Sequence, residues 1–330
     1  VIQARERVAI AGGERWPSVG LGVDGSRSFA PDFIQPSERS YQSNINVGLG
    51  ISWQADLFGK IRRSVEAAQY QSLANEADYL ALQHTLVAEL VRLRASVAVS
   101  QRELAVQTDI VDSRQRTLDT VGRRYQLGVK NTSALSVYTA EENVASAQAQ
   151  LVVLDRQLTE NLLVLDTLLN QRPGTLQEIA TAFPLLPHSG AVTVDIPAAL
   201  LDQRPDIRGN EFRLMATNAQ VGVAMTDLFP DLTLSINGGF ASDQWGGLFD
   251  NNNALGSLTG QITTRLFEGG RLRAQIRLRE SELREQAAQY AKLVLNALAE
   301  VETALVQEHY LAEQVVLLQR GTSAARKAEG

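Results

Sequence analysis

The chain contains no cysteine, which excludes disulfides, thiolate metal sites and a cysteine nucleophile within these 330 residues. It has only three histidines, which lie far apart and show none of the spacings, such as HExxH, that zinc sites use: His84, His188 and His309. We interpret them as surface or packing residues, and we expect neither a metal nor any other cofactor.

Long apolar runs and excess positive charge are also missing. No stretch reaches the roughly 18 apolar residues that a transmembrane helix needs. The formal net charge of −6 offers no basic surface for nucleic acid, so no nucleic-acid partner is expected. The glycines of "GLGVDG" (20–25) match GxGxxG, but they lie inside an alternating segment rather than between a strand and a helix. No catalytic constellation is found, and no enzymatic activity is expected.

What the sequence does contain is a segment with two different faces. From residue 44 to residue 57, apolar side chains occupy the odd positions, and polar side chains or glycines occupy the even ones. Weaker alternation predicts strands at 18–24, 231–237 and 257–266, with loops at 29–42 and 241–254. A strand of about ten residues spans roughly 33 Å and crosses a bilayer when tilted. A soluble sandwich also fits this alternation, and the strands alone do not decide between the two.

If the strands cross a bilayer, one face meets water and the other meets lipid. The side chains predicted to line the water-filled lumen are Asn46, Gly50, Gln54, Thr233, Ser235, Thr259 and Gln261. The side chains predicted to face lipid are Val47, Ile51, Trp53, Leu232 and Leu234.

The helices are the second informative feature. Helical periodicity continues from about residue 60 to residue 127, a rod of about 100 Å at 1.5 Å per residue. Few globular domains enclose such a rod. The chain turns at Gly128, and a second helix with a coiled-coil seam of alanines and leucines runs from about 133 to 170. These features favour long packed helices outside a compact core.

An internal repeat organises the chain. "VAIAGGERWPSVGLGVDG" (8–25) matches "VGVAMTDLFPDLTLSING" (221–238), and "DLFGKIRR" matches "RLFEGGRLR" at an offset of 209. The first repeat is predicted to cover 1–170, with a β-hairpin at 17–58 and a helical hairpin at 60–170. A proline-rich connector is expected at 171–204. The second repeat is predicted at 205–330, and its parts are a helix at 206–228, a β-hairpin at 230–267 and a long helix at 271–328.

Two stretches carry a resemblance to a known family. "LLDQRPDIRGNEFRLMATNAQVGVAMTDLFPDLTLS" (200–235) and "RYQLGVKNTSALSVYTAEENVASAQAQL" (124–151) resemble the connector and the periplasmic tip of TolC-type outer membrane factors. The RPDI wording is similar to that of the lipoprotein (NodT-like) branch, which serves tripartite RND efflux pumps. Together with the repeat, the resemblance covers nearly the whole chain.

The resemblance implies a mixed fold, in which long coiled-coil helices join transmembrane β-strands. Four strands per chain would form a trimeric 12-stranded β-barrel, continued by a periplasmic α-helical barrel. The implied function is the exit duct of an efflux pump, passively conducting drugs or other small molecules across the periplasm and the outer membrane. The implied partners are two further copies, a periplasmic adaptor protein, an inner-membrane RND-type transporter and outer membrane lipid.

Particular residues follow from the same resemblance. The adaptor-contact tip maps onto Leu127, Gly128 and Val129, although Gly128 equally fits a plain left-handed helix cap. The family's constriction lies on the returning helix of the second half, which the repeat places beyond Gly330. A lipid anchor on an N-terminal cysteine would lie outside this chain. The alternative is a structural or adhesin-like coiled-coil protein with a small β domain.

Overall fold

The computed structural model describes residues 1–31, 39–176 and 203–329. The chain divides into two compact units, one formed by residues 1–80 and 197–330 and the other by residues 81–196. The predicted connector at 171–204 therefore lies mostly outside the described residues. Within those described residues, no helix combines the length and the apolar character that crossing a membrane requires.

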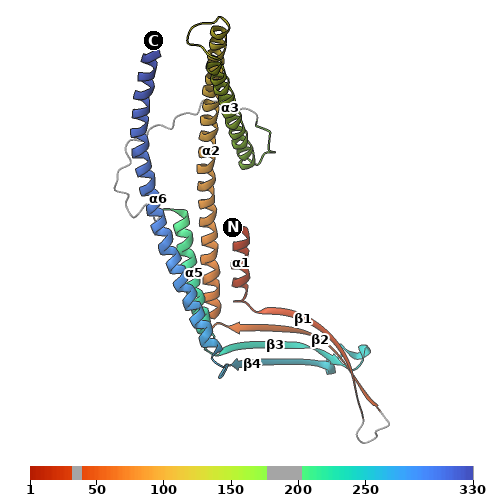
Figure 1. The fold of residues 1–330 in the computed structure, drawn as a ribbon. Coiled ribbons are helices and arrows are strands. Elements are labelled where there is room, and N and C mark those ends of the chain that lie inside the picture. The colour runs from red at the N-terminus through yellow and green to blue at the C-terminus, as the bar shows by residue number, and fades with distance from the viewer. Residues whose placement is uncertain (32–38, 177–202, 330) are drawn as a thin grey trace. The chain divides into compact units, whose positions relative to one another are not determined.

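The first unit contains a four-stranded antiparallel sheet in the order β1-β2-β3-β4 (Figure 1). Its strands are β1 (Ser18–Pro31), β2 (Arg39–Ala55), β3 (Asp231–Ser242) and β4 (Ala254–Thr263). Each hairpin joins neighbours in sequence, and the β2–β3 pair joins the two hairpins. β2, the segment with the clearest alternation, thus lies inside the sheet and pairs with a strand along each of its two edges.

The pairing register keeps the two kinds of residue apart. Ile51 lies opposite Ile236 and Trp53 lies opposite Leu234, while Gln54 lies opposite Thr233. Because successive side chains of a strand point to opposite faces, this register places the apolar partners on one face and the polar partners on the other.

The strand boundaries differ from those expected. The strands of the first hairpin have 14 and 17 residues instead of about ten, so the predicted loop at 29–42 was too long. In the second hairpin, β4 starts at Ala254 and ends at Thr263 rather than near 266. Its last residue pairs with Asp231, the first residue of β3. Asp231 follows Pro230, which has no N–H to donate, so the ladder ends there.

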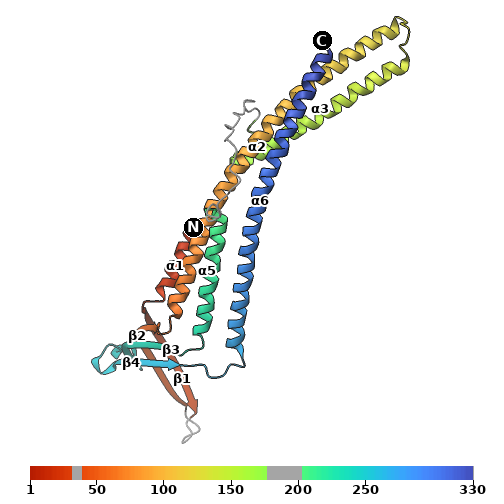
Figure 2. The same ribbon diagram turned by 90° about the vertical axis from the view of Figure 1, so that its left-hand side faces the viewer.

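Four helical segments of the first unit lie side by side (Figures 1 and 2). They are α1 (Ile2–Gly13), residues 60–80 of α2 (Lys60–Gln126), α5 (Pro205–Thr226) and α6 (Arg271–Glu329). The helix boundaries lie within two residues of those predicted, and Pro205 occupies the first turn of α5, where its missing N–H costs nothing. Ion pairs link neighbours: Arg5 of α1 with Glu76 of α2 at 2.8 Å, and Arg213 of α5 with Asp78 of α2.

Small residues let these helices approach one another. A Cβ on Gly222 of α5 would lie 3.3 Å from the Arg63 side chain of α2, and one on Gly209 would lie 3.0 Å from Asp78. Ala216, Ala219 and Ala224 of α5 are buried. The absence of bulk on these faces therefore sets the close packing of α5 on α2.

The second unit is built on a helical hairpin, formed by residues 81–126 of α2 and by α3 (Ala134–Leu168). Its core consists of Leu93 and Val97 from α2 and Leu162 and Leu165 from α3. The predicted seam is present, since smaller residues nearer the turn are also buried: Ala140, Val144 and Ala147. Leu169, the last residue of the predicted seam, is half exposed because α3 ends at Leu168.

Asp166 holds the chain that leaves α3. Its carboxylate is fully buried and accepts hydrogen bonds from the backbone N–H groups of Gly174 (2.8 Å), Thr175 (3.1 Å) and Leu176 (3.2 Å). The charge is therefore satisfied by backbone donors, which explains its burial.

Candidate functional site

The polar face of the sheet is the first candidate. Glycines are frequent on and beside it, and neighbouring atoms crowd the space beside two of them. A Cβ on Gly50 would lie 3.1 Å from the Asn237 side chain, and a Cβ on Gly239 would lie 2.6 Å from the Gly48 Cα. Five of the predicted lumen residues lie in adjacent pairs across the ladder: Gln54 opposite Thr233, Thr233 opposite Gln261, and Ser235 opposite Thr259.

The opposite face is apolar and largely exposed. On the two outer strands, the exposed fraction is 67% for Val19 and 71% for Leu21 in β1, and 77% for Leu258 and 72% for Ile262 in β4. Val47, Ile51, Trp53, Leu232 and Leu234, predicted to face lipid, share this face and are half-buried. An exposed apolar surface of this kind marks a face that meets another apolar phase or partner.

Aromatic side chains lie at both ends of the sheet. At the end beside the helices, Phe58 stacks on Phe229 with ring centroids 4.8 Å apart, and the Trp53 Nε1–H donates to the Arg15 carbonyl at 3.0 Å. At the other end, Phe240 and Phe249 meet edge to face at 5.5 Å. Aromatic girdles above and below an apolar band are typical of strands that cross a membrane.

A charged network lies where the strands meet the helices. Lys60 of α2 pairs with Asp227 at 2.6 Å, and the Gln54 Nε2 donates to Asp231 at 3.0 Å. Arg265, which follows β4, lies 3.8 Å from Asp227 and 3.5 Å from Asp231. The two aspartates thus bridge β2, the start of α2 and the segment after β4.

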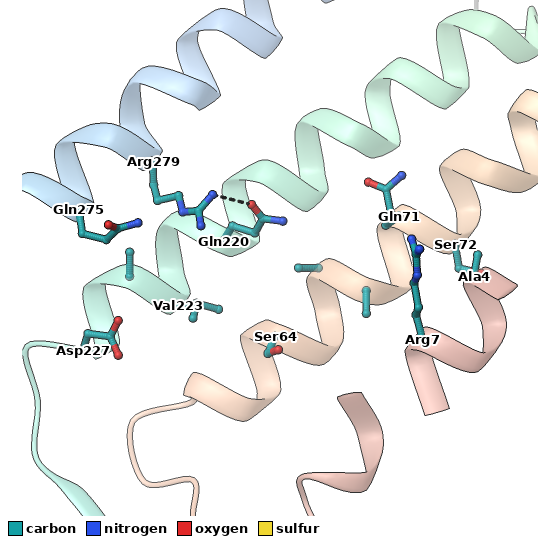
Figure 3. A pocket seen from close by; sticks show the side chains of 13 residues that line it. Ala4, Arg7, Ser64, Gln71, Ser72, Gln220, Val223, Asp227, Gln275 and Arg279 are labelled. Carbon is teal, nitrogen blue, oxygen red and sulfur yellow. Dashed lines mark hydrogen bonds between the residues drawn. The ribbon is translucent and has the colours of Figure 1, made fainter. Parts of the chain in front are cut away.

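A cavity of about 360 Å³ lies among the four helices of the first unit (Figure 3). Alanines, serines and glutamines line it, together with Arg7 of α1 and Arg279 of α6. Arg279 donates to Gln220 at 3.5 Å and to Glu282 at 2.8 Å. Arg7 is exposed and Arg279 is half-buried, so both arginines also face solvent.

The RPD stretch forms a clamp between α5 and α6. Arg204 donates to Asp206 at 3.2 and 2.9 Å and to Glu300 of α6 at 3.0 Å. The hydrogen bonds from Arg204 lower the pKa of the Asp206 carboxyl, against the opposing effect of partial burial. The same contact raises the pKa of the Arg204 guanidinium. Both groups therefore stay charged, and the motif holds the start of α5 on α6.

The predicted tip residues lie together in the turn after α2. Gly128 has φ +66°, its N–H donates to Tyr125 O at 3.0 Å, and the Val129 N–H donates to Arg124 O at 3.1 Å. These two bonds define a Schellman cap, so the reading of Gly128 as a left-handed cap is confirmed. Leu127 is 80% exposed. The exposed side chains of Leu135 and Tyr138 in the first turns of α3 add to the apolar surface of this turn.

Sequence reasoning missed the charged network and the cavity. Two of the network's bonds join residues that are more than 160 positions apart, so no local spacing could reveal them. The sequence indicates the RPD motif of the clamp only through its resemblance to the family signature. Within the described residues, no cluster of three or more histidines, aspartates or glutamates could hold a metal ion.

Known proteins share this arrangement. The family model for outer membrane efflux proteins matches residues 1–171 and 196–328. The probable efflux pump outer membrane protein SepC of Pseudomonas putida is 30% identical over 302 residues, covering 91% of this chain and 62% of that protein. OprJ of Pseudomonas aeruginosa is 29% identical over 340 residues, covering 98% and 68%. The solved outer-membrane channel OprN matches with a TM-score of 0.86 at 29% identity, covering 98% of this chain and 73% of that chain.

The two-faced sheet and its long helices therefore define a chain with the fold of an outer-membrane channel. It belongs to the outer membrane efflux protein family. This confirms the resemblance to the family and the expected location at the outer membrane. The chain spans 62% of the length of SepC, one of the curated relatives that it matches.

Proposed function

We propose that this chain is part of the exit duct of a tripartite efflux pump, through which small molecules pass passively from an inner-membrane RND-type transporter to the outside. The observation that carries the proposal is the four-stranded sheet, which has one exposed apolar face, one polar face rich in glycine, and aromatic residues at both ends. Relatives with names such as "efflux pump outer membrane protein" support the same function.

The sheet argues for a closed assembly of copies. In lipid, each unpaired backbone group costs several kcal/mol, and an edge strand of ten residues leaves about five such groups unpaired. Two edges therefore cost tens of kcal/mol, more than the roughly 5–15 kcal/mol that stabilises a typical domain. Eight strands from two copies enclose only side chains, whereas about twelve strands from three copies leave room for a lumen. A homotrimer with a 12-stranded barrel, built from a twofold repeat in each chain, follows.

The helices continue the wall of the duct. α2 begins five residues after β2 and contains 67 residues, about 100 Å of helix. Such a length suits a helical barrel that extends into the periplasm. We assign the lumen and lipid faces as the alternation predicts, and a lipid anchor outside this chain remains a prediction.

The turn around Gly128 is proposed to contact the periplasmic adaptor. Leu127, Gly128 and Val129 lie at the end of α2, and the exposed apolar surface there includes Leu135 and Tyr138. A partner protein would cover such a surface.

One experiment tests the duct and its docking to the adaptor separately. In the full-length protein, Gly128→Trp is expected to leave a detergent-resistant trimer that no longer supports drug efflux in a strain without its own duct. The left-handed backbone adds only about 1–2 kcal/mol of strain, too little to dismantle the assembly. Gly122→Trp, on the same helix with open space around it, is the matched control and should retain efflux. Loss of the trimer would make Gly128 a structural residue, and full efflux would contradict docking at this turn. A full-length protein that is monomeric and soluble without detergent would overturn the duct itself.

A further inference from the structure

The cavity of about 360 Å³ in the first unit has a regular lining (Figure 3). Each of the four helices contributes side chains that lie three or four positions apart, and such residues share one face of a helix. α1 contributes Ala4 and Arg7, and the side chains from α2 include Ser64, Ala68 and Ser72. The four helices therefore turn faces of small and polar residues toward one shared space.

This cavity is connected to the polar face of the sheet. Asp227 lines the cavity, and Arg265 lies 3.8 Å from Asp227 and 3.5 Å from Asp231. Asp231 accepts a hydrogen bond from Gln54, which lies opposite Thr233 on the polar face. The contacts thus place the cavity and the polar face on the same side of the first unit. If the polar face lines the lumen of the proposed duct, the cavity opens into that lumen.

The cavity carries positive charge without a matching carboxylate. The Arg7 side chain forms neither an ion pair nor a hydrogen bond with another described residue. Arg279 shares its charge with Glu282 at 2.8 Å. Asp227 is the acidic residue among those that line the cavity, and Lys60 already pairs with it at 2.6 Å. A bound anion would therefore meet an unpaired cation and no unpaired carboxylate.

The rest of the lining suits an organic molecule. Ala4, Ala67 and Ala224 are buried and give the cavity apolar surface. The amide groups of Gln71 and Gln220 can donate or accept hydrogen bonds, and Figure 3 shows the Arg7 side chain extending toward Gln71. The volume of about 360 Å³ lies within the roughly 300–1,000 Å³ of typical small-molecule pockets. The cavity can therefore hold a small molecule that has both an apolar and a charged part.

We propose that this cavity binds small organic anions, molecules that carry a carboxylate on an apolar body, and that Arg7 recognises their charge. This inference rests on the proposed duct and names a class of molecule that the duct would favour. The planar guanidinium can donate two parallel hydrogen bonds to a carboxylate, while the apolar body covers the alanines. Because Arg7 is exposed, water weakens this contact, and weak binding suits a passive duct, which must release what enters it.

Binding to the purified full-length protein in a non-ionic detergent tests the site. The probe is 2-naphthoate, and 2-naphthamide is a neutral molecule of the same shape. Arg7→Gln should weaken the binding of 2-naphthoate by about fivefold and that of 2-naphthamide much less, read by isothermal titration. Arg5→Gln is the matched control, because Arg5 lies on the same helix, pairs with Glu76 and does not line the cavity. Equal affinity of the unmodified protein for the two molecules, or equal weakening by the two variants, would overturn the site.

Two further variants test the location and the geometry of the contact. Ala68→Leu adds bulk at a half-buried position in the lining and should lower the binding of 2-naphthoate although Arg7 is still present. Arg7→Lys keeps the charge but loses the paired donors, so it should retain part of the affinity that Arg7→Gln loses. Unchanged binding in Ala68→Leu would place the anion outside the cavity and overturn the proposal.

Efflux measurements separate this site from the proposed function. In a strain that lacks its own duct and whose pump exports 2-naphthoate, Arg7→Gln should reduce the efflux of 2-naphthoate more than that of an uncharged drug, and Arg5→Gln should not. Absence of all efflux with the unmodified protein would count against the duct. Normal efflux by a protein that does not prefer 2-naphthoate to 2-naphthamide would overturn the anion site and leave the duct in place.

Discussion

In the centre of the sheet, β2 and β3 pair with each other and with one further strand each, whereas β1 and β4 have a neighbour on one side only. The segments that follow β2 and β4 differ in the same way. After β2, Phe58 stacks on Phe229, but after β4, Phe267 is 89% exposed. Both phenylalanines follow a leucine in the same Leu-Phe motif. Phe58 thus has an aromatic partner within the chain, whereas Phe267 has none among the described residues.

The charged residues at the two junctions also act differently. Asp56 accepts from the backbone N–H groups of Ile61 (3.0 Å) and Arg62 (2.8 Å), so it caps the start of α2. Arg265 instead lies within 4 Å of three acidic side chains, Asp227, Asp231 and Glu268. The first junction is fixed by directed hydrogen bonds and the second by looser ion pairs.

The largest effect is expected at the centre of the sheet, from Gly239→Ala. The added methyl would lie 2.6 Å from the Gly48 Cα and would also contact the Val47 carbonyl oxygen, which are backbone atoms that cannot move aside alone. We expect a loss of about 1–3 kcal/mol or more, measured by thermal denaturation in detergent. Gly256→Ala on β4 is the matched control, since the nearest atom to its Cβ is 3.8 Å away. Equal stability of the two variants would contradict the close central contact.

A smaller difference should separate the two junctions. Asp56→Ala removes the cap of α2 and should cost about 0.5–2 kcal/mol. Arg265→Ala removes partly exposed ion pairs at 3.5–3.8 Å, and should cost about 0–1 kcal/mol. Asp56→Asn, which keeps one acceptor oxygen, should recover part of the loss. The order of the two costs, read from the same denaturation curves, shows whether the cap at the first junction contributes more stability than the ion pairs at the second.

The phenylalanines offer a third comparison. Phe58→Ala removes a stacked pair worth about 0.5–1.5 kcal/mol beyond the buried area. Phe267→Ala removes a side chain that is almost fully exposed in the single chain, so its cost should be smaller. The measurement is the midpoint of thermal unfolding of the purified protein. A larger loss from Phe267→Ala would mean that this edge is covered in the assembly.

Local patterns predicted the elements well and their partners poorly. The helical periodicity and the capping residues predicted the helix ends to within about two residues of the observed ones, because both signals depend on residues only a few positions apart. Strand ends were less predictable, since β4 ends where its partner β3 begins and not where its own alternation stops. The bonds from Lys60 to Asp227 and from Arg213 to Asp78 depend on which helices become neighbours, and no single segment contains that information.

The smallest expected effect concerns the clamp that ties α6, next to the open edge, to the central helix α5. Arg204 lowers the pKa of Asp206 through hydrogen bonds, so the charged carboxylate is more stable in the folded than in the unfolded chain. This contribution is present above the unfolded pKa of about 3.9 and is lost as the pH falls through the lower folded pKa. Because the Asp206 side chain is 34% exposed, solvent screening limits the effect to less than about 1 kcal/mol. Asp206→Asn should therefore be less stable than the unmodified protein at pH 6, and the difference in unfolding temperature should shrink between pH 4 and pH 3. A difference that stays constant over this range would mean that Asp206 contributes through its shape and hydrogen bonds alone.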